Sequence, residues 1–375
     1  MKIVISSALA MLLAATSLCA QQNQSAAPRP KMNSSQKTME PFEQGYDLCA
    51  DKFPAAYNAP ARVDVRDCWD LFLTGSFLYW YVGQDGLELA ISANSSTHLI
   101  TSGASIASSD QSYHPGFKVG LGINFDVDNW VGYVEYTWMH SKTKTSLGAL
   151  AAGESWSLAN WYSNFSIGDT QISAETVSSS WKYGFDMVDL VVSRPFYQGR
   201  KVTVSPYGGL KGFSLRQSFR VSANNGSVNS ISFNENISHN KQKSWAIGLL
   251  TGMQTHWLLG AGFRMEGDLG LSLLYNKFDK LSSRADMNGI DGTSVHVRQK
   301  VSTVRPTMDL SAGLGWGSYL DRQNYHFDML FAYEFFLLPG QNMMRYVANE
   351  NIYMNSAAPN DLFMHGLTAK LRFDF

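Results

Sequence analysis

The feature that most constrains this chain is an alternation of apolar and polar side chains along segments of about ten residues or more. It is clearest at the end of the sequence, where one parity carries Phe363, His365, Leu367, Ala369, Leu371, Phe373 and Phe375. The opposite parity carries Thr368, Lys370, Arg372 and Asp374. Because successive side chains of a strand point to opposite faces, the segment predicts a β-strand with one apolar and one ionisable face.

The same alternation recurs through most of the chain and predicts strands at residues 117–125, 130–140, 181–193, 202–215, 245–257, 263–275, 304–316, 325–336 and 361–375. Residues 69–94 keep their large apolar side chains on one parity across the sequence GQDG, which indicates one long strand kinked there. This interpretation predicts about ten strands, with twelve as the alternative if the Cys49 region or the segment 142–180 adds strands.

Two details within these segments bear on the strands themselves. Residues 185–192 are apolar on both faces near Val191, so their orientation stays open. Pro206 and Pro306 fall inside predicted strands, and proline lacks the backbone donor that a ladder needs. We therefore expect a bulge at each proline.

The connections between the strands alternate between short and long. Short turns are predicted at 126–129, 195–201, 258–261 and 320–324, and long polar loops at 95–114, 142–180, 222–243, 279–297 and 338–360. A tilted strand needs about 9 to 11 residues to cross a bilayer, and an open sheet edge is not tolerated in lipid. The sequence therefore predicts an all-β fold, a transmembrane antiparallel up-and-down β-barrel with long extracellular loops.

Aromatic side chains make up 13% of the sequence, and many lie near the predicted strand ends. Aromatic girdles occupy this position at both faces of a membrane. The members are Tyr79, Trp80, Tyr81, Trp130, Trp138, Trp181, Trp245, Trp257, Trp316 and Tyr325.

The start of the chain predicts export. Lys2 precedes an apolar stretch that ends near Ala20, so residues 1–20 are expected to be a signal peptide, followed by a polar periplasmic arm at 21–68 and the barrel at 69–375. The arm contains Cys49 and Cys68, which we expect to form a disulfide in an oxidising compartment. The alternative is that both are free or intermolecularly paired thiols.

Ionisable residues gather on the non-apolar parity of the last four strands, the face predicted to line the lumen. They are Arg264, Glu266, Asp268, Arg305, Asp309, His326, Asp328, Glu334, Lys370, Arg372 and Asp374. Such a set favours either a water-filled path for small polar solutes or a self-satisfied ion network that partly plugs a narrow barrel. The sequence leaves both hypotheses open.

Other functional classes have less support. With 31 acidic and 30 basic residues the chain has no field that would attract nucleic acid. The histidines and cysteines show no metal-ligand spacing and the glycine-rich segments precede no helix, so no metal or cofactor is expected. His326 and Asp328, with Asp309 on the next strand, are the one grouping suggestive of an outer-membrane hydrolase, which stays a remote alternative.

Four segments carry a family resemblance, and they read WDLFLTGSFLYWYVGQDGLELAIS, FDMVDLVVSRPFY, VSPYGGLKG and HGLTAKLRFDF. Over roughly residues 65–375 the chain resembles the major outer membrane protein family of Legionella and of chlamydia-related bacteria. The resemblance implies an abundant surface barrel of the bacterial outer membrane with porin-like activity, sometimes also an adhesin or antigen through its loops. It implies no catalytic residues.

The partners that we expect follow from this location. They are outer-membrane lipid, the barrel assembly machinery, a second copy of the chain, and a host or envelope partner that meets the loops. Phe375 is predicted to be the assembly signal at the periplasmic rim. The aromatic residues of the second loop, Trp156, Trp161, Tyr162 and Phe165, either contact such a partner or fold into the barrel mouth.

Overall fold

The structure, a computed structural model, describes residues 63, 65, 70–94, 103–125, 128–158, 172–228, 231–288, 294–347 and 359–375. The predicted signal peptide, almost all of the predicted arm, Cys49 and Cys68 lie outside the described residues, as do Trp161, Tyr162 and Phe165. Among the described residues no helix is long and apolar enough to cross a membrane.

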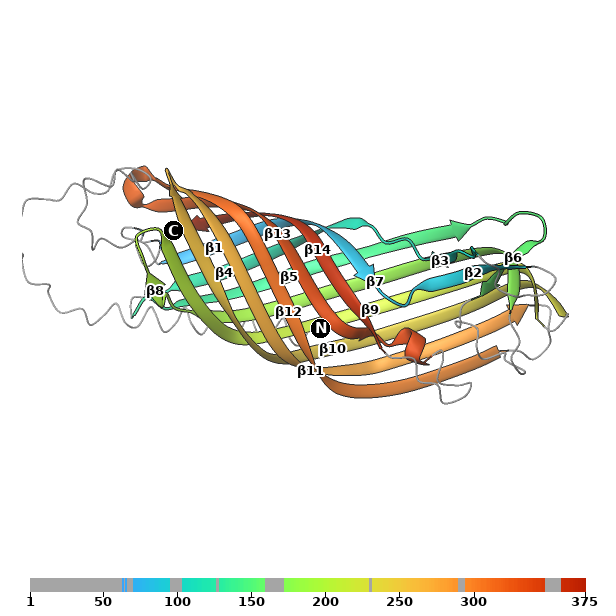
Figure 1. The fold of residues 1–375 in the computed structure, drawn as a ribbon. Helices are drawn as coiled ribbons and strands as arrows, with labels where there is room; N and C mark the ends of the chain where they lie inside the picture. Colours follow the sequence, from blue (N-terminus) through green and yellow to red (C-terminus); the bar gives the residue numbers. More distant parts are fainter. Residues whose placement is uncertain are drawn as a thin grey trace, which may run out of the picture. The chain divides into compact units, whose positions relative to one another are not determined.

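Ten long antiparallel strands close into a barrel (Figure 1). In ring order they are β1 (Leu71–Gln84), β4 (Tyr113–Asn124), β5 (Val131–Leu147), β7 (Ser173–Ser193), β9 (Val202–Val228), β10 (Ile231–Gly260), β11 (Phe263–Asn288), β12 (Ser294–Leu320), β13 (Tyr325–Asn342) and β14 (Asn360–Asp374). The ring is complete because β14 pairs with β1, from Phe72 opposite Asp374 to Gln84 opposite Leu362. The predicted fold and strand number are confirmed.

Four short strands accompany the barrel, and they are β2 (Glu88–Asn94), β3 (Ile106–Ser108), β6 (Glu154–Leu158) and β8 (Tyr197–Gln198). The prediction that residues 69–94 form one strand is wrong, because β2 leaves the β1 ladder and pairs with β3 and β6. Gly86 has φ +79°, and this left-handed turn redirects the chain. As a result Leu87 and Leu89 are buried.

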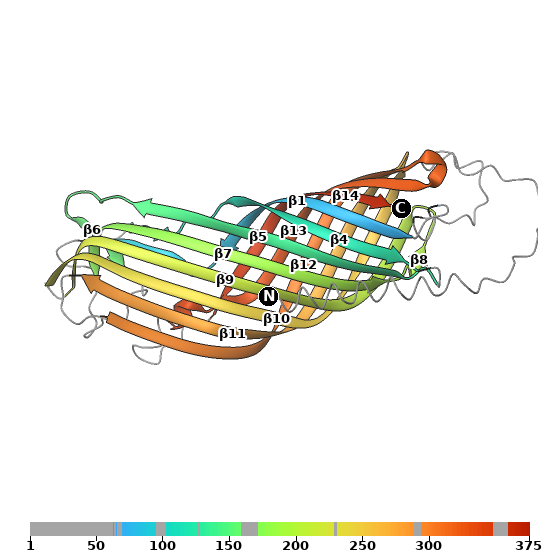
Figure 2. The same ribbon diagram turned by 180° about the vertical axis from the view of Figure 1, so that it is seen from behind.

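The strands on one side of the barrel run far beyond the length that a membrane requires. β9, β10, β11 and β12 have 27, 30, 26 and 27 residues, whereas β4 has 12. Figure 2 shows β5, β7, β9, β10 and β11 side by side, extending away from the end that holds β8. Much of the three segments that were predicted to be loops therefore consists of strand; these segments are 142–180, 222–243 and 279–297. The strand residues within them form a part of the wall that is called the extension below.

The two prolines do not produce the bulges expected there. Pro206 pairs in register with Met253, and Pro306 pairs in register with Leu273. Each lies where the ladder on its other side has ended, since β7 pairs with β9 only as far as Tyr207 and β13 pairs with β12 only from Met308. A missing donor is tolerated at such an edge.

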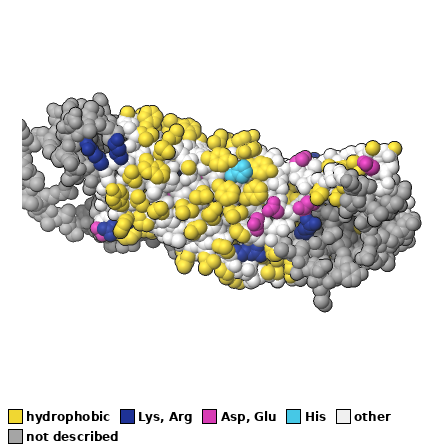
Figure 3. Space-filling model, in the orientation of Figure 1, with side chains coloured by type: hydrophobic (Ala, Val, Ile, Leu, Met, Phe, Trp, Pro, Cys, Tyr) yellow, Lys and Arg dark blue, Asp and Glu magenta, His cyan; other side chains and the backbone are white. Residues whose placement is uncertain are grey.

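The outward face of the barrel is an apolar belt. Leu249, Leu273, Leu314, Phe331 and Leu367 are among its exposed members, and Figure 3 shows apolar side chains covering the middle of one face with charged ones toward both ends. At the short-turn end Phe375 is 37% exposed and exchanges two backbone hydrogen bonds with Leu71, of 2.9 and 3.2 Å. The last residue thus closes the barrel rim on its apolar parity.

Candidate functional site in the barrel interior

The interior at the short-turn end is lined by charged side chains in ion pairs. Arg264, near the start of β11, contacts Glu266, with Nε 2.6 Å from Oε1. It also forms a bidentate pair with Asp328 of β13, in which Nη2 donates to Oδ1 at 2.8 Å. The planar guanidinium fork suits such a pair. Two acidic side chains therefore share one arginine, whose side chain is 18% exposed.

A second set in the same layer joins β13 to the final strand. His326 Nδ1 lies 3.1 Å from Asp374 Oδ2, and Arg372 Nη2 donates to Asp374 Oδ1 at 2.6 Å. The Asp374 side chain is fully buried, and the Arg372 guanidinium carbon lies 3.7 Å from the centroid of the Phe72 ring. A buried carboxylate is retained here because two nitrogen groups compensate its lost hydration.

Further along the axis, lysines bridge strands that are distant in sequence. Lys118 Nζ of β4 lies 2.6 Å from Glu334 Oε2 of β13 and 3.6 Å from Glu135 Oε1 of β5. Lys370 Nζ lies 4.0 Å from Glu135 Oε2, and the Tyr133 hydroxyl donates to the same oxygen at 2.6 Å. The lumen is thus crossed by charge pairs at its middle.

A third group surrounds Lys211 of β9. Its Nζ lies 2.8 Å from Asp309 Oδ2 and 3.6 Å from Asp189 Oδ2, and its side chain is 3% exposed. Nearby, the Tyr207 hydroxyl donates to Asp268 Oδ1 at 2.8 Å. One lysine therefore compensates two carboxylates.

Of the residues predicted to line the lumen, all face the interior, and all except Arg305 join these charged groups or contact their members directly. Arg305 lies nearer the loop end, where Nη1 donates to the carbonyl of Pro339 at 3.1 Å. Sequence reasoning missed Lys118, Glu135, Asp189 and Lys211. The parity rule applied to 117–125, 130–140 and 202–215 would have placed three of them inside.

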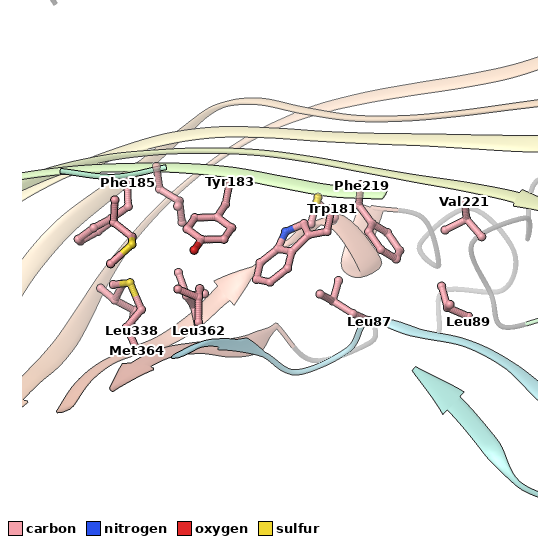
Figure 4. Packing of buried hydrophobic residues seen from close by; sticks show 14 of the residues in the cluster. Leu87, Leu89, Trp181, Tyr183, Phe185, Phe219, Val221, Leu338, Leu362 and Met364 are labelled. Atoms are coloured by element: carbon pink, nitrogen blue, oxygen red, sulfur yellow. The ribbon is translucent and has the colours of Figure 1, made fainter. Parts of the chain in front are cut away.

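Toward the loop end an apolar cluster fills the interior, and we call it the plug. Figure 4 shows Phe185, Tyr183 and Trp181 of β7 and Phe219 and Val221 of β9 facing Leu338, Leu362, Met364, Leu87 and Leu89 across the barrel. The Trp181 side chain is completely buried and Trp80 is 2% exposed, so the prediction that these two belong to an aromatic girdle is wrong. The ring centroid of Phe336, a member of this cluster, lies 5.0 Å from Lys211 Nζ. The plug therefore directly adjoins the charged layers.

The segment after β13 also turns into the barrel. The Gln242 side chain of β10 donates to the carbonyl of Gln341 at 2.6 Å and accepts from the N–H of Met343 at 3.0 Å. Met343 and Val347 pack on Phe278 and Leu281 of β11. This inner segment therefore packs on the inner face of β10 and β11.

One wall of the interior remains polar. The inward residues of β10 over nine positions are Asn236, Ser238, Asn240, Gln242 and Ser244, all buried. On the neighbouring strands Gln217 and Asn276 are also buried, and within the described residues neither side-chain amide has a hydrogen-bonding partner. We call this set the polar stripe. Buried amides without protein partners are normally satisfied by water.

The grouping suggestive of a hydrolase does not assemble. His326 pairs with Asp374, Asp328 pairs with Arg264, and Asp309 pairs with Lys211. Among the described residues no group of three or more histidine, cysteine and acidic side chains is arranged to hold a metal ion. Trp156 of the second loop is 7% exposed, belongs to the plug cluster and donates to the Gly148 carbonyl at 2.8 Å.

Comparison with known proteins gives one family. Residues 64–375 match the model of the Legionella pneumophila major outer membrane protein precursor. No curated protein matches the chain. Similar solved structures include the outer membrane protease OmpT from Escherichia coli, with 12% identity, 84% of this chain and 99% of that chain covered, and a TM-score of 0.38. A Pseudomonas aeruginosa FadL homologue has 9% identity, coverages of 81% and 89%, and a TM-score of 0.25.

Proposed function

This chain belongs to the Legionella major outer membrane protein family, and from that premise we propose that it passes small ions or polar solutes through a narrow, gated lumen. The family and the closed barrel locate it in the bacterial outer membrane. The observation that carries the proposal is the polar stripe. It runs from the extension toward the charged layers and offers hydrogen-bonding groups along the whole depth of the plug.

The charged layers support the same proposal by their energetics. Charges removed from water lose several kcal/mol of solvation each, and replacing a buried ion pair by packed apolar residues is often neutral or stabilising. A barrel that needed only stability would therefore be served by apolar filling at Lys118, Lys211 and Arg264. Charged side chains that line a narrow path are instead a means of selecting ions.

The plug then acts as the gate. Its members on β7 and β9 belong to the wall, whereas Leu89 comes from the short strand β2 and Leu87 from the residue just before it, both outside the barrel ladder. Displacement of β2 would leave the polar stripe open to the mouth. We therefore expect small and infrequent conductance steps from the native protein.

Planar-bilayer recording of the purified, folded protein tests the proposal. Trp181→Ala removes the largest fully buried plug side chain and should raise the step size or the open fraction several-fold. Leu249→Ala, which shortens an exposed outward side chain of β10, is the matched control and should leave the step size and the open fraction unchanged. If neither the native protein nor Trp181→Ala conducts, the porin-like function is refuted.

A second candidate function is a surface or adhesive role with a permanently closed barrel. The burial of Trp156 in the plug cluster favours it, because this contact ties the second loop to the barrel mouth. Deletion of residues 151–172 separates the two functions. Higher conductance after the deletion supports a constriction, and lost adherence of cells to host surfaces supports a ligand.

We further propose that the protein has no enzymatic activity. The acidic and basic groups of the interior are committed to one another, and the grouping around His326 is divided among three ion pairs. Peptidase and lipase assays on the folded protein check this. Activity that persists in His326→Gln would point to a contaminant, and activity lost in that variant would contradict the proposal.

A further inference from the structure

The outer wall of the extension carries exposed basic side chains in transverse rows. In the row nearest the apolar belt, Arg216 of β9 lies opposite Lys243 of β10, which lies opposite Lys280 of β11. In the next row Lys142 of β5 lies opposite Lys182 of β7. Lys241 of β10 belongs to the same row, opposite Ser218. These six residues, all exposed, are called the basic array.

The like charges of the basic array repel one another across paired strands. Residues directly opposite on antiparallel strands have Cβ atoms about 5 Å apart, and like charges at such positions are destabilising. Lys142 with Lys182, Arg216 with Lys243, and Lys243 with Lys280 are all pairs of this kind. The pKa of Lys142 is lowered, first by the charge of Lys144, then by burial and by the charge of Lys182.

Two acidic side chains beside the array offset part of this charge: Asp279, which precedes Lys280 and lies 3.8 Å from Lys277 Nζ, and Asp186. Asp186 faces the same side, where its Oδ2 lies 3.1 Å from Arg216 Nη2 and its Oδ1 lies 3.1 Å from His140 Nε2. Within the part of the chain that the structure describes, the five lysines of the array take part in no salt bridge. The array therefore presents charge that an external anion would neutralise.

The position of the array identifies the anion. Trp245, whose ring meets Tyr275 edge to face at 5.9 Å, is the next outward residue of β10 after Lys243 toward the apolar belt. On β5, Trp138 is likewise the next outward residue after His140 toward the apolar belt, and the two ring centroids are 4.6 Å apart. Aromatic girdles mark the boundary between the hydrocarbon core and the headgroups. The basic array begins one rung above that boundary, at the level of lipid phosphates.

We propose that the basic array binds the phosphate groups of outer-leaflet glycolipids that surround the barrel. Neighbouring strands are about 4.8 Å apart and successive outward residues about 7 Å apart. The array therefore spans more than one phosphate, which suits a lipid that carries several. This inference rests on the membrane location and is independent of whether the lumen conducts.

Lipid binding by the full-length protein in detergent tests the proposal. Native mass spectrometry would compare diphosphorylated lipid A with the same lipid after dephosphorylation. The triple variant Lys142→Gln/Lys182→Gln/Lys243→Gln should weaken binding of the phosphorylated lipid at least about tenfold, because each cation near an anionic surface contributes appreciably. The native protein should bind the dephosphorylated lipid weakly, and added salt should reduce the difference.

A matched control removes the same charge from the opposite rim. Arg200→Gln/Lys201→Gln/Arg322→Gln changes exposed residues of the short-turn end and should leave lipid binding unchanged. If the basic-array triple variant fails to fold, as judged by heat-dependent migration in gels, Lys243→Gln alone and the salt titration of the native protein take its place. Equal affinity for both lipids, or binding of inorganic polyphosphate or an oligonucleotide as tight as that of lipid A, would overturn the proposal.

Discussion

Replacement of Lys211 by methionine should strongly destabilise the barrel, because the lysine compensates two buried carboxylates. At an effective dielectric constant of ~20 the attraction is about 6 kcal/mol for the 2.8 Å contact with Asp309 and about 5 kcal/mol for the 3.6 Å contact with Asp189. The desolvation of the lysine offsets a large part of this attraction. Breaking a buried pair from one side typically costs about 3 to 5 kcal/mol, and we expect Lys211→Met to fall in that range.

Urea unfolding in lipid vesicles, followed by tryptophan fluorescence, measures this loss as a change in the free energy of unfolding. Lys201→Met is the control, since that lysine is exposed at a turn and its replacement should change stability by less than about 0.5 kcal/mol. Adding Asp309→Asn to Lys211→Met should restore part of the loss, about 1 to 3 kcal/mol, because one uncompensated carboxylate is removed.

The result that would refute this reasoning is a loss below about 1 kcal/mol for Lys211→Met. Asp189 and Asp309 would then be hydrated well enough to need no cation, so the layer around Lys211 would be wet rather than dry. That outcome would also raise the conductance expected from the native lumen, because water at this layer would connect the polar stripe to the short-turn end.

Three further predictions concern the outside and the ends of the barrel. Deletion of Phe375 should impair membrane insertion more than the conductance of the inserted fraction, because two backbone hydrogen bonds to Leu71 close the rim; normal insertion of the truncated chain would contradict this. Leu249→Arg should lower the free energy of unfolding by about 2 kcal/mol, as a charge on the lipid face does, and an unchanged urea midpoint would place Leu249 outside the bilayer. In the extension, burial and then the charges of Arg220 and Lys241 lower the pKa of His239 below its ordinary 6.5, so its protonation should destabilise the protein as pH falls below that value. Arg220→Gln should raise this pKa in an NMR titration, and an unaltered or lower value would show that Arg220 is not a cause.

The sequence by itself determined the class of the fold, most of its strands and the faces of most of them. Parity within a strand is a local property, and a lipid-facing wall requires every second side chain to be apolar whatever the rest of the chain does. For this reason the pattern around Phe375 predicted the last strand, and the alternation of short and long connections predicted a closed barrel. The predicted number of ten strands is right although residues 69–94 are not one strand, because β2 lies outside the ring. The inward placement of the predicted charged residues follows from the same rule.

Where the strands end was beyond the sequence. In the extension both faces of β10 are largely polar, since every second residue from Asn236 to Ser244 points inward and Lys241 and Lys243 between them point outward. No apolar period therefore distinguishes strand from loop there. The departure of β2 from β1 was hidden as well. Leu87 and Leu89 keep the parity of the belt, and only the turn at Gly86 redirects them into the plug.

Which charges meet was decided by the tertiary structure alone. Lys118 and Glu334 are 216 residues apart in sequence, and their contact exists because closure of β14 on β1 sets the strands facing across the lumen. The basic array depends in the same way on the registers of β5, β7, β9, β10 and β11, because a one-residue slip would move its lysines to the other face. Parity tells which face a side chain occupies, whereas register and closure determine what it touches.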